Sequence, residues 1–297
     1  MRICLRCEKS LTEATWTCSA CGYEPKKDGP FAVFAPEFSQ QNEGYDASFY
    51  AELFEVESKN FWFRARNELI VWCLKRYFPA AKSLLEVGCG TGFVLSRLEK
   101  SFADLKVWGT EIYAEGLGFA KRRLTGGELF QADARALPFQ DEFDVIGAFD
   151  VLEHIDEDVV VLKRFHRAVR AGGGVIITVP QHPFLWSEFD AFSKHVRRYR
   201  RQELVSKLQV AGFEVVCVGS FVSLLFPAIA LTRFAKKTER QMSPEHLKEH
   251  MLADLKMGRL MNWTLEKILA VERLLIKAGL RFPFGGSLFA VAIKKAV

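Results

Sequence analysis

Two features are scarce in this chain of 297 residues: long apolar runs and a strong excess of one charge. The longest apolar stretch, Phe221 to Leu231, falls far short of the roughly 20 residues that a helix needs to cross a bilayer. The first residues also lack the apolar core of a secretory signal, which predicts a cytoplasmic protein. A formal charge of +5 permits an anionic substrate, whereas nucleic-acid binding predicts a more concentrated excess of basic residues.

Cysteine is clustered at the N-terminus, where four of the seven thiols lie within the first 21 residues. The four form two CxxC knuckles, Cys4-Leu5-Arg6-Cys7 and Cys18-Ser19-Ala20-Cys21, each able to turn both thiolates toward one ion. In a reducing compartment such a set favours a metal over disulfides, and four thiolates in tetrahedral array suit structural Zn²⁺. We therefore expect a zinc ribbon over residues 1–35; a chance or redox-active cluster is the alternative.

Apolar runs and amphipathic stretches alternate through the middle of the chain. Strands are expected at 83–87, 106–110, 128–131, 143–149, 174–179 and 213–219, and helices at 93–100, 114–124, 157–170 and 201–211. Such alternation predicts a doubly wound, Rossmann-like α/β fold, in which a mostly parallel sheet carries helices on both faces. Ligands of such sheets bind at the carboxyl ends of the strands.

The first expected strand ends in a glycine loop, Glu86-Val87-Gly88-Cys89-Gly90-Thr91-Gly92. Glycines at this spacing let the backbone turn tightly and approach a ligand, although the spacing alone is weak evidence. Glu86 discriminates between ligands, because a carboxylate repels a pyrophosphate but attracts the ammonium group of a sulfonium amino acid. The loop therefore favours S-adenosylmethionine over a dinucleotide.

Two further strand ends carry acidic residues in register with this loop. Glu111 lies about 20 residues after the loop, the position from which a carboxylate accepts both ribose hydroxyls. A nicotinamide enzyme would share that feature. Asp133 ends the third strand and can accept a hydrogen bond from an adenine amino group, with Ala134 packed on the ring. Taken alone, Asp133 would be read as a helix N-cap.

Together these residues resemble the class I S-adenosylmethionine-dependent methyltransferases, and the stretch from Gly147 to His154 resembles that of the ubiquinone-biosynthesis O-methyltransferases. The Asn-Pro-Pro-Tyr motif of many amino-methylating enzymes is absent. The resemblance implies a seven-stranded sheet with an antiparallel last strand. It also implies a set of cofactor-binding residues: Glu86, Gly88, Cys89, Gly90, Gly92, Glu111, Ile112, Asp133, Ala134, Phe149 and Asp150.

Methyl transfer to a hydroxyl needs a group that takes the proton, and the sequence offers two histidines for this role. His154 follows the fourth strand and His195 lies in the loop after the fifth. The alternative for His154 is a helix start that faces solvent. By resemblance, Asp150-x-x-Glu153-His154 matches a cluster associated with Mg²⁺, although a histidine is not a natural magnesium ligand. The expected acceptor-site residues are His182, Trp186, Arg197, Arg198 and Tyr199.

Upstream, Phe61 to Asn67 sets aromatic side chains beside two arginines, of which Arg64 can reach the methionine carboxylate. Downstream, a long helical insertion precedes the last strand, and its apolar residues can cap a pocket, form a dimer interface or rest on a membrane through residues 221–237. Packing against the sheet is the alternative. The expected domains are a ribbon (1–35), a linker with a helical segment (36–80), the methyltransferase core (81–220), the insertion (221–285) and the closing strand (286–297).

The function expected from the sequence is methyl transfer from S-adenosylmethionine to an oxygen of a small or lipid-linked acceptor. The expected location is cytoplasmic, including peripheral contact with the inner face of a membrane. An alternative is a ribosomal-RNA methyltransferase, because the ribbon resembles those that precede some rRNA guanine methyltransferases; RNA ranks behind a small acceptor as partner. A third reading is a non-catalytic adenosyl-binding or scaffold protein. The accepting atom and the oligomeric state are left open.

Overall fold

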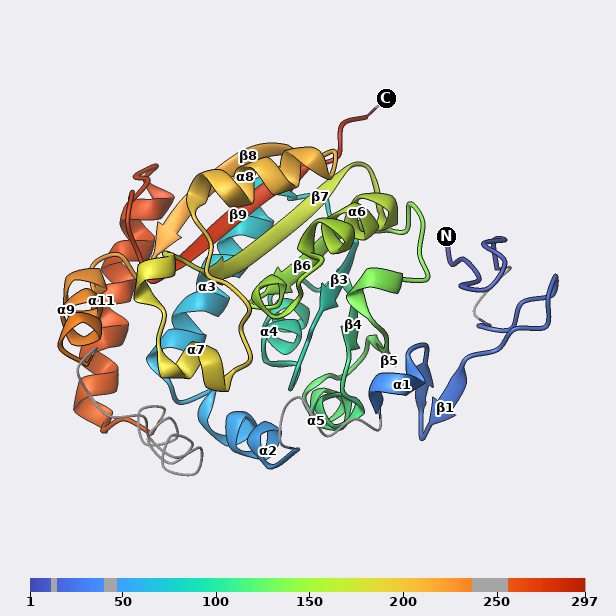
Figure 1. Cartoon of the computed structure of the whole chain (residues 1–297), viewed down its shortest axis with the longest axis horizontal. Coiled ribbons are helices and arrows are strands. Elements are labelled where there is room, and N and C mark those ends of the chain that lie inside the picture. Colours follow the sequence, from blue (N-terminus) through green and yellow to red (C-terminus); the bar gives the residue numbers. More distant parts are fainter. Residues whose placement is uncertain (12–14, 40–46, 237–255, 297) are drawn as a thin grey trace.

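A computed structural model describes residues 1–11, 15–39, 47–236 and 256–296 (Figure 1). The strands are β1 (Lys26–Asp28), β2 (Phe31–Val33), β3 (Ser83–Val87), β4 (Lys106–Glu111), β5 (Glu128–Gln131), β6 (Phe143–Phe149), β7 (Val169–Pro180), β8 (Glu214–Phe221) and β9 (Ser287–Ile293). The helices are α1 (Pro36–Ser39), α2 (Ala47–Val56), α3 (Phe61–Tyr77), α4 (Phe93–Ser101), α5 (Ala114–Arg123), α6 (Asp158–Ala168), α7 (Glu188–Phe192), α8 (Arg201–Val210), α9 (Phe226–Lys236) and α11 (Arg259–Lys277). Short 3₁₀ helices are η1 (Ala134–Ala136), η2 (Leu152–His154) and η3 (Pro183–Leu185).

In the described part of the chain the strands form one sheet in the order β1-β2-β5-β4-β3-β6-β7-β9-β8. Neighbours from β2 to β7 pair in parallel, while β9 runs antiparallel to both β7 and β8. The expected mostly parallel, Rossmann-like fold is confirmed. Its seven core strands are extended at the β5 edge by the β1–β2 hairpin, which the sequence pattern did not reveal.

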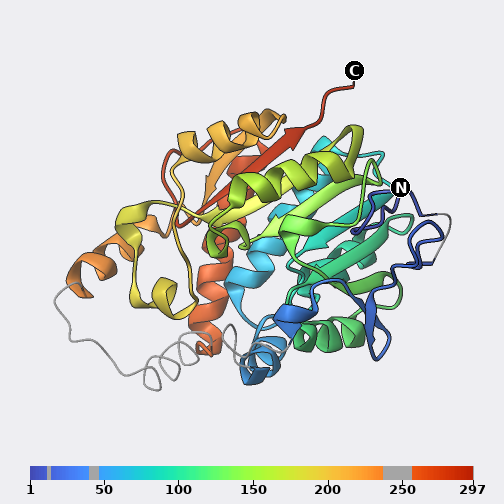
Figure 2. The ribbon, with the colours of Figure 1, turned by 45° about the vertical axis from the view of Figure 1, so that its right-hand side comes forward.

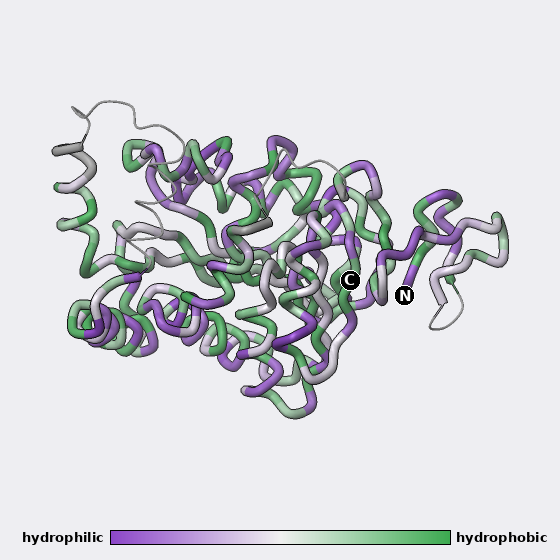
Figure 3. Tube along the Cα trace, turned by 90° about the horizontal axis from the view of Figure 1, so that it is seen from below, coloured by the Kyte–Doolittle hydropathy of each residue, from purple (hydrophilic) through white to green (hydrophobic). Residues whose placement is uncertain are grey.

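Helices cover both faces of this sheet, which explains why the central strands are apolar throughout. The core on one face contains buried residues of α3, α4, α5 and α11, and the core on the other face contains those of α6 and α8. Apolar and polar residues alternate along the surrounding helices, as expected for elements that bury one side (Figure 3).

The strand order reverses at β3, because the chain leads from β3 to β4 and β5 on one side and then returns to β6 and β7 on the other. At such a switch point the loops after adjacent strands diverge and leave a crevice at the carboxyl ends. The glycine loop, Glu111, Asp133 and Asp150 all follow these carboxyl ends. The topology therefore gathers residues that lie far apart in the sequence.

The N-terminal segment and the segment containing α9 and α11 lie at opposite sides of the molecule (Figures 1 and 2). The N-terminal segment packs on the β5 side through Trp16, whose ring lies near that of Phe130 in β5, with centroids 6.0 Å apart. The guanidinium of Arg2 lies 4.2 Å from the ring of Trp16 and pairs with Glu128 at 2.7 Å. On the other side α11 packs against α3, where Leu269 and Ile276 join the core.

Candidate active site

The glycine loop joins β3 to α4 through backbone that favours glycine. Gly88, Gly90 and Gly92 have φ angles of +71°, +50° and +73°. A Cβ on Gly90 would meet nothing within 4 Å, so this residue leaves open space beside the loop. Gly92 lies outside the lining of both cavities described below, and a Cβ there would lie 2.8 Å from the Ala120 Cα. Close packing of α4 on α5 therefore accounts for Gly92.

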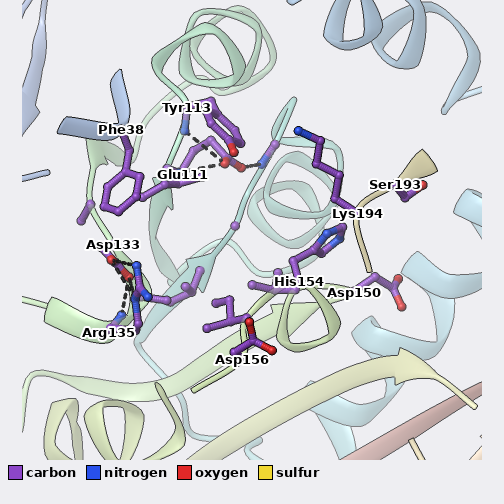
Figure 4. A pocket seen from close by; sticks show the side chains of 18 of the residues that line it. Phe38, Glu111, Tyr113, Asp133, Arg135, Asp150, His154, Asp156, Ser193 and Lys194 are labelled. Atoms are coloured by element: carbon purple, nitrogen blue, oxygen red, sulfur yellow. Dashed lines mark hydrogen bonds and ion pairs between the residues drawn. The ribbon is translucent and has the colours of Figure 1, made fainter. Parts of the chain in front are cut away.

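A cavity of about 540 Å³ lies at the carboxyl ends of β3 to β6 (Figure 4). Its lining includes two acidic residues, Glu111 and Asp133, and the aromatic side chains of Tyr113 and Phe38 (Figure 4). Seven of the expected cofactor-binding residues line it: Gly88, Gly90, Glu111, Ile112, Asp133, Ala134 and Asp150. Their role in binding remains a prediction.

Glu111 is held in place by backbone amides. Its Oε2 accepts from the Gly90 N–H at 2.9 Å and its Oε1 accepts from the Ile112 N–H at 2.8 Å. Burial raises the pKa of this carboxyl, although these amide hydrogen bonds oppose the shift. Oε1 also accepts from the Tyr113 N–H at 3.4 Å. The glycine loop and the end of β4 are thereby fixed to one another, and Oε2 has a second lone pair available to a ligand.

Asp133 combines a structural role with its place in the cavity wall. Its side chain accepts from the Arg135 N–H at 2.8 Å and so caps η1, and it pairs with the Arg135 guanidinium at 2.7 Å. Asp133 is thus both the N-cap of η1 and part of the cavity lining. The adenine contact remains a prediction, as does the packing of Ala134 on the ring.

Glu86 and Arg66 are two buried ionisable side chains beside the loop, close enough for the charge of Arg66 to act on Glu86. Glu86 is 2% exposed, and its Oε2 has no hydrogen-bond partner among the described residues. Burial raises the pKa of Glu86 well above its usual range, against the opposing charge of Arg66. The Nε of Arg66 also lacks a partner in the described part of the chain, although another of its nitrogens pairs with Asp150. One free acceptor and one free donor therefore fit the ammonium and carboxylate of an amino-acid ligand.

A second cavity of about 670 Å³ adjoins the first and shares Gly88, Gly90, Asp150 and His154 with it. Its walls come mainly from α2, α3, α9 and α11 and the loop after β7, and they are largely apolar. The expected cofactor residues Glu86, Cys89 and Phe149 line this second cavity, together with Phe61, Trp62, Phe93, Leu185, Phe189, Leu225, Ile229 and Leu265.

His195 faces this second cavity with its imidazole oriented by a buried carboxylate. The Nδ1 of His195 lies 2.9 Å from Oδ1 of Asp190, which has no exposed side-chain surface. Burial raises the pKa of Asp190, but the hydrogen bond from His195 and the charge of Arg198 bring it down to about 2. Because Asp190 is therefore ionised, the proton of a neutral His195 ring resides on Nδ1, and Nε2 carries a lone pair.

His154 lines both cavities, and its ring meets that of His195 edge-on with centroids 4.7 Å apart. Burial and the neighbouring His195 lower the pKa of His154 to about 4, which makes it a poor proton acceptor. Glu153 is fully buried with both carboxylate oxygens unpartnered among the described residues, and burial raises its pKa well above the usual range. The geometry thus favours His195 over His154 as the base.

The expected magnesium cluster is not assembled as its spacing suggested. Asp150 pairs with Arg66, whereas Glu153 and His154 form a group with His195 in which the ligand atoms all lie within 4.8 Å of one another. Mg²⁺ prefers oxygen ligands in octahedral array, so two imidazoles and one carboxylate do not suit it. The Mg²⁺ expectation therefore does not fit the donor set.

Several expected acceptor-site residues lie elsewhere. Arg197 pairs with Asp158 at 2.6 Å, and the fully buried Tyr199 donates from its hydroxyl to the same carboxylate at 2.6 Å. His182 stacks with Phe284 outside both cavities, and Trp186 is 43% exposed there. Of the five expected residues, Arg198 alone is among the second cavity's lining. Residues adjacent in this loop point in different directions, so only part of the expected set lines a cavity; contact of these residues with an acceptor remains a prediction.

The sequence analysis did not single out Arg66 or Asp190 as candidate site residues. Arg64, the expected partner of a carboxylate, instead bonds the Lys59 carbonyl at 2.6 Å and pairs with Glu266 at 3.4 Å. Arg66 is 8% exposed, and its guanidinium lies 4.6 Å from the ring of Trp62. The four-residue spacing from Trp62 to Arg66 places both on one face of α3, a signal that helical periodicity could have revealed.

The four N-terminal cysteines converge. The Sγ atoms of Cys4 and Cys21 lie 3.6 Å apart, as do those of Cys7 and Cys18, and all four ligand atoms lie within 4.8 Å of one another. In a tetrahedron with Zn–S bonds of about 2.3 Å, sulfurs lie about 3.8 Å apart. All four are free thiols, so the geometry fits Zn²⁺.

Comparison with known proteins places this site in context. A family model described as a methyltransferase domain matches residues 59–218. The fatty-acid O-methyltransferase of Mycolicibacterium smegmatis is 34% identical over 175 residues, which cover 57% of this chain and 64% of that protein. The ubiquinone biosynthesis O-methyltransferase of Pseudomonas paraeruginosa is 28% identical over 123 residues, which cover 38% and 50%. The chain thus spans between half and two thirds of the length of these relatives.

Among solved structures, phosphoethanolamine N-methyltransferase 2 of Haemonchus contortus, in complex with S-adenosyl-L-methionine, matches with a TM-score of 0.57. The sequence identity is 20%, and the match covers 88% of this chain and 60% of that chain. At this identity the likeness shows a shared fold.

Proposed function

This chain belongs to the class I S-adenosylmethionine-dependent methyltransferases, and from that premise we propose that it methylates an oxygen atom of a small or lipid-linked apolar acceptor. The observation that carries the proposal is the His195–Asp190 pair, 2.9 Å apart, at the wall of an apolar cavity beside the glycine loop. The relatives named fatty-acid O-methyltransferase and ubiquinone biosynthesis O-methyltransferase support oxygen as the accepting atom.

S-adenosylmethionine supplies a methyl carbon activated by its sulfonium group. In the proposed complex the open space at Gly90 receives the ligand close to the backbone. Glu86 accepts from its ammonium group, Arg66 donates to its carboxylate, and Glu111 accepts from the ribose hydroxyls. The partnerless Oε2 of Glu86 and Nε of Arg66 support this orientation, because buried polar atoms without partners are rare in folded proteins.

The proposed acceptor occupies the second cavity, whose apolar walls exclude water from its hydroxyl or carboxyl group. His195 takes the proton of an acceptor hydroxyl at Nε2, while Asp190 holds the ring through Nδ1 and stabilises the positive charge that develops. Arg198, which donates from Nε to Asp190 at 2.8 Å, keeps that carboxylate ionised and lies where an anionic acceptor group would approach. General base catalysis of this kind contributes about 10²- to 10⁴-fold.

For the N-terminal cluster we propose a structural Zn²⁺ held by Cys4, Cys7, Cys18 and Cys21. With four protein ligands the ion has no open position for a substrate. The contact of Trp16 with Phe130 ties this segment to the β5 side of the sheet, remote from α9 and α11. The ion therefore supports the fold of the N-terminal segment.

The proposal is tested by measuring S-adenosylhomocysteine release against long-chain fatty acids, prenylated phenols and rRNA. We expect turnover with an apolar acceptor. His195→Ala should lower turnover of a hydroxyl acceptor about 10²- to 10⁴-fold at neutral pH and recover as rising pH ionises that acceptor in solution. Binding of S-adenosylmethionine by calorimetry should not change.

His166→Ala is the matched control, because His166 of α6 packs against Phe213 and lines neither cavity. Turnover of His195→Ala within a few-fold of the parent at neutral pH would remove His195 as the base. Turnover confined to rRNA would instead overturn the assignment of an apolar acceptor.

A further inference from the structure

Helix α11 presents large apolar side chains on the face that it turns to solvent. Leu260, Trp263, Val271 and Leu274 are 78%, 58%, 51% and 65% exposed. They recur at steps of three or four residues, with Lys267 between Trp263 and Val271, so they form one stripe along the helix. We call these four residues the outer stripe.

The opposite face of α11 packs against the rest of the protein. Leu269 is fully buried and Ile276 is 1% exposed, and both belong to the core that contains α3. A helix that packs on one side normally carries polar residues on the other. An outer stripe of Leu, Trp and Val on a packed helix therefore indicates an apolar partner.

The charges around the outer stripe have one sign. Between residues 256 and 284, which the structure describes without a gap, the exposed charged side chains are all basic: Lys256, Arg259, Lys267, Lys277 and Arg281. The two acidic residues of this stretch are turned inward. Glu266 pairs with Arg273 at 3.1 Å, and the buried Glu272 accepts from the Ser223 and Leu224 amides at 2.8 and 2.9 Å.

We propose that the outer stripe of α11 docks on an anionic lipid bilayer, with these five basic side chains at the level of the headgroups. Exposed Leu, Trp and Val beside Lys and Arg are the composition of a helix that lies in the membrane interface. A second copy of this chain fits less well, because a two-fold contact through the same face would oppose five cations to five cations.

The segment that carries the outer stripe also forms part of the wall of the second cavity. Leu265 of α11, Met257 just before it and Ile229 of α9 line the second cavity. Docking would therefore bring this wall to the lipid, the source from which an apolar acceptor comes. The binding itself does not depend on the reaction, so its failure would leave the proposed methyl transfer standing. No helix in the described part of the chain has the length and hydropathy of a membrane span.

The test is flotation of the full chain with vesicles of phosphatidylcholine alone or mixed with phosphatidylglycerol. We expect binding that requires phosphatidylglycerol and weakens as salt is raised. Lys267→Glu/Lys277→Glu should weaken binding at least tenfold, because each surface cation contributes about fivefold. The control Lys121→Glu/Lys163→Glu makes the same charge change on α5 and α6, where both lysines are exposed.

Apolar contact is tested separately with Leu260→Gln/Leu274→Gln, which should abolish flotation, against Val210→Gln on α8, where Val210 is 62% exposed. Vesicles should also shift the tryptophan emission to the blue, and Trp263→Phe should remove most of that shift while flotation persists. Equal binding to neutral and anionic vesicles, or unchanged flotation of the glutamine variant, would overturn the proposal. So would a dimer in sedimentation that Leu260→Gln/Leu274→Gln dissociates, because the face would then be a protein interface.

Discussion

Glu86→Gln should weaken binding of S-adenosylmethionine while leaving the fold intact. The substitution keeps the shape of a side chain that is 2% exposed but removes the charge that would meet the ligand's ammonium group. A hydrogen bond to a charged group contributes about 1.5–3 kcal/mol, which corresponds to a rise of about 10- to 150-fold in Kd. Isothermal titration calorimetry measures this change directly.

The pH dependence gives a second readout. Burial raises the pKa of Glu86 well above its usual range. At a pH below this raised pKa, the carboxyl of the free protein holds a proton that ligand binding must release. Below that raised pKa the affinity of the parent should rise up to tenfold per pH unit, and the slope should be shallower in Glu86→Gln. Glu57 and Glu111, whose pKa values burial also raises, leave a residual slope in the variant.

As pH rises, the affinity for the ligand should increase, whereas the stability of the ligand-free protein should decrease. The folded-state pKa of Glu86 is raised, so its contribution to stability is fully present below the unfolded pKa of about 4.3 and is lost as pH rises through the folded pKa. Above pH 5, Glu86→Gln should therefore lose less stability with rising pH than the parent, as measured by urea unfolding.

Glu115→Gln is the matched control, because this carboxylate is exposed in the first turn of α5 and should alter neither affinity nor its pH slope. The assignment of Glu86 to the ammonium group fails if Glu86→Gln binds the ligand as tightly as Glu115→Gln does. An unchanged pH slope would mean that another buried carboxyl takes up the proton.

Three further substitutions test the structure at other points. Cys18→Ser should lose bound zinc by elemental analysis and lower Tm, because a tetrahedral site loses one ligand; retained stoichiometric zinc would count against the four-thiolate site. Tyr199→Phe removes a buried hydrogen bond to Asp158 and should cost about 1–3 kcal/mol in urea unfolding without raising the acceptor KM; a higher KM with unchanged stability would return Tyr199 to the acceptor site. Gly92→Ala should cost about 1–3 kcal/mol, because φ is +73° and the added Cβ meets Ala120 at 2.8 Å; unchanged unfolding would show that α5 moves aside easily.

Local patterns were sufficient to predict the features that depend on neighbouring residues. The alternation of apolar strands and amphipathic helices predicts the parallel sheet, and the loop that starts at Glu86 predicts the ligand class, because both patterns express constraints within a few residues. The two CxxC pairs predict convergence of four thiols for the same reason. The β1–β2 hairpin escaped notice because strands of three residues each show no clear period.

Only the tertiary structure decided which polar groups meet across the sequence. Asp150 pairs with Arg66 from 84 residues away, which removes it from the expected magnesium cluster. The proposal of His195 rather than His154 as the base rests on the burial of His154 and on the contact of His195 with Asp190, and the buried Tyr199 donates to Asp158. Side-chain direction and burial depend on the packing of distant elements, so residue type and spacing alone predicted at which edge of the sheet a ligand binds but not which side chains pair with one another there.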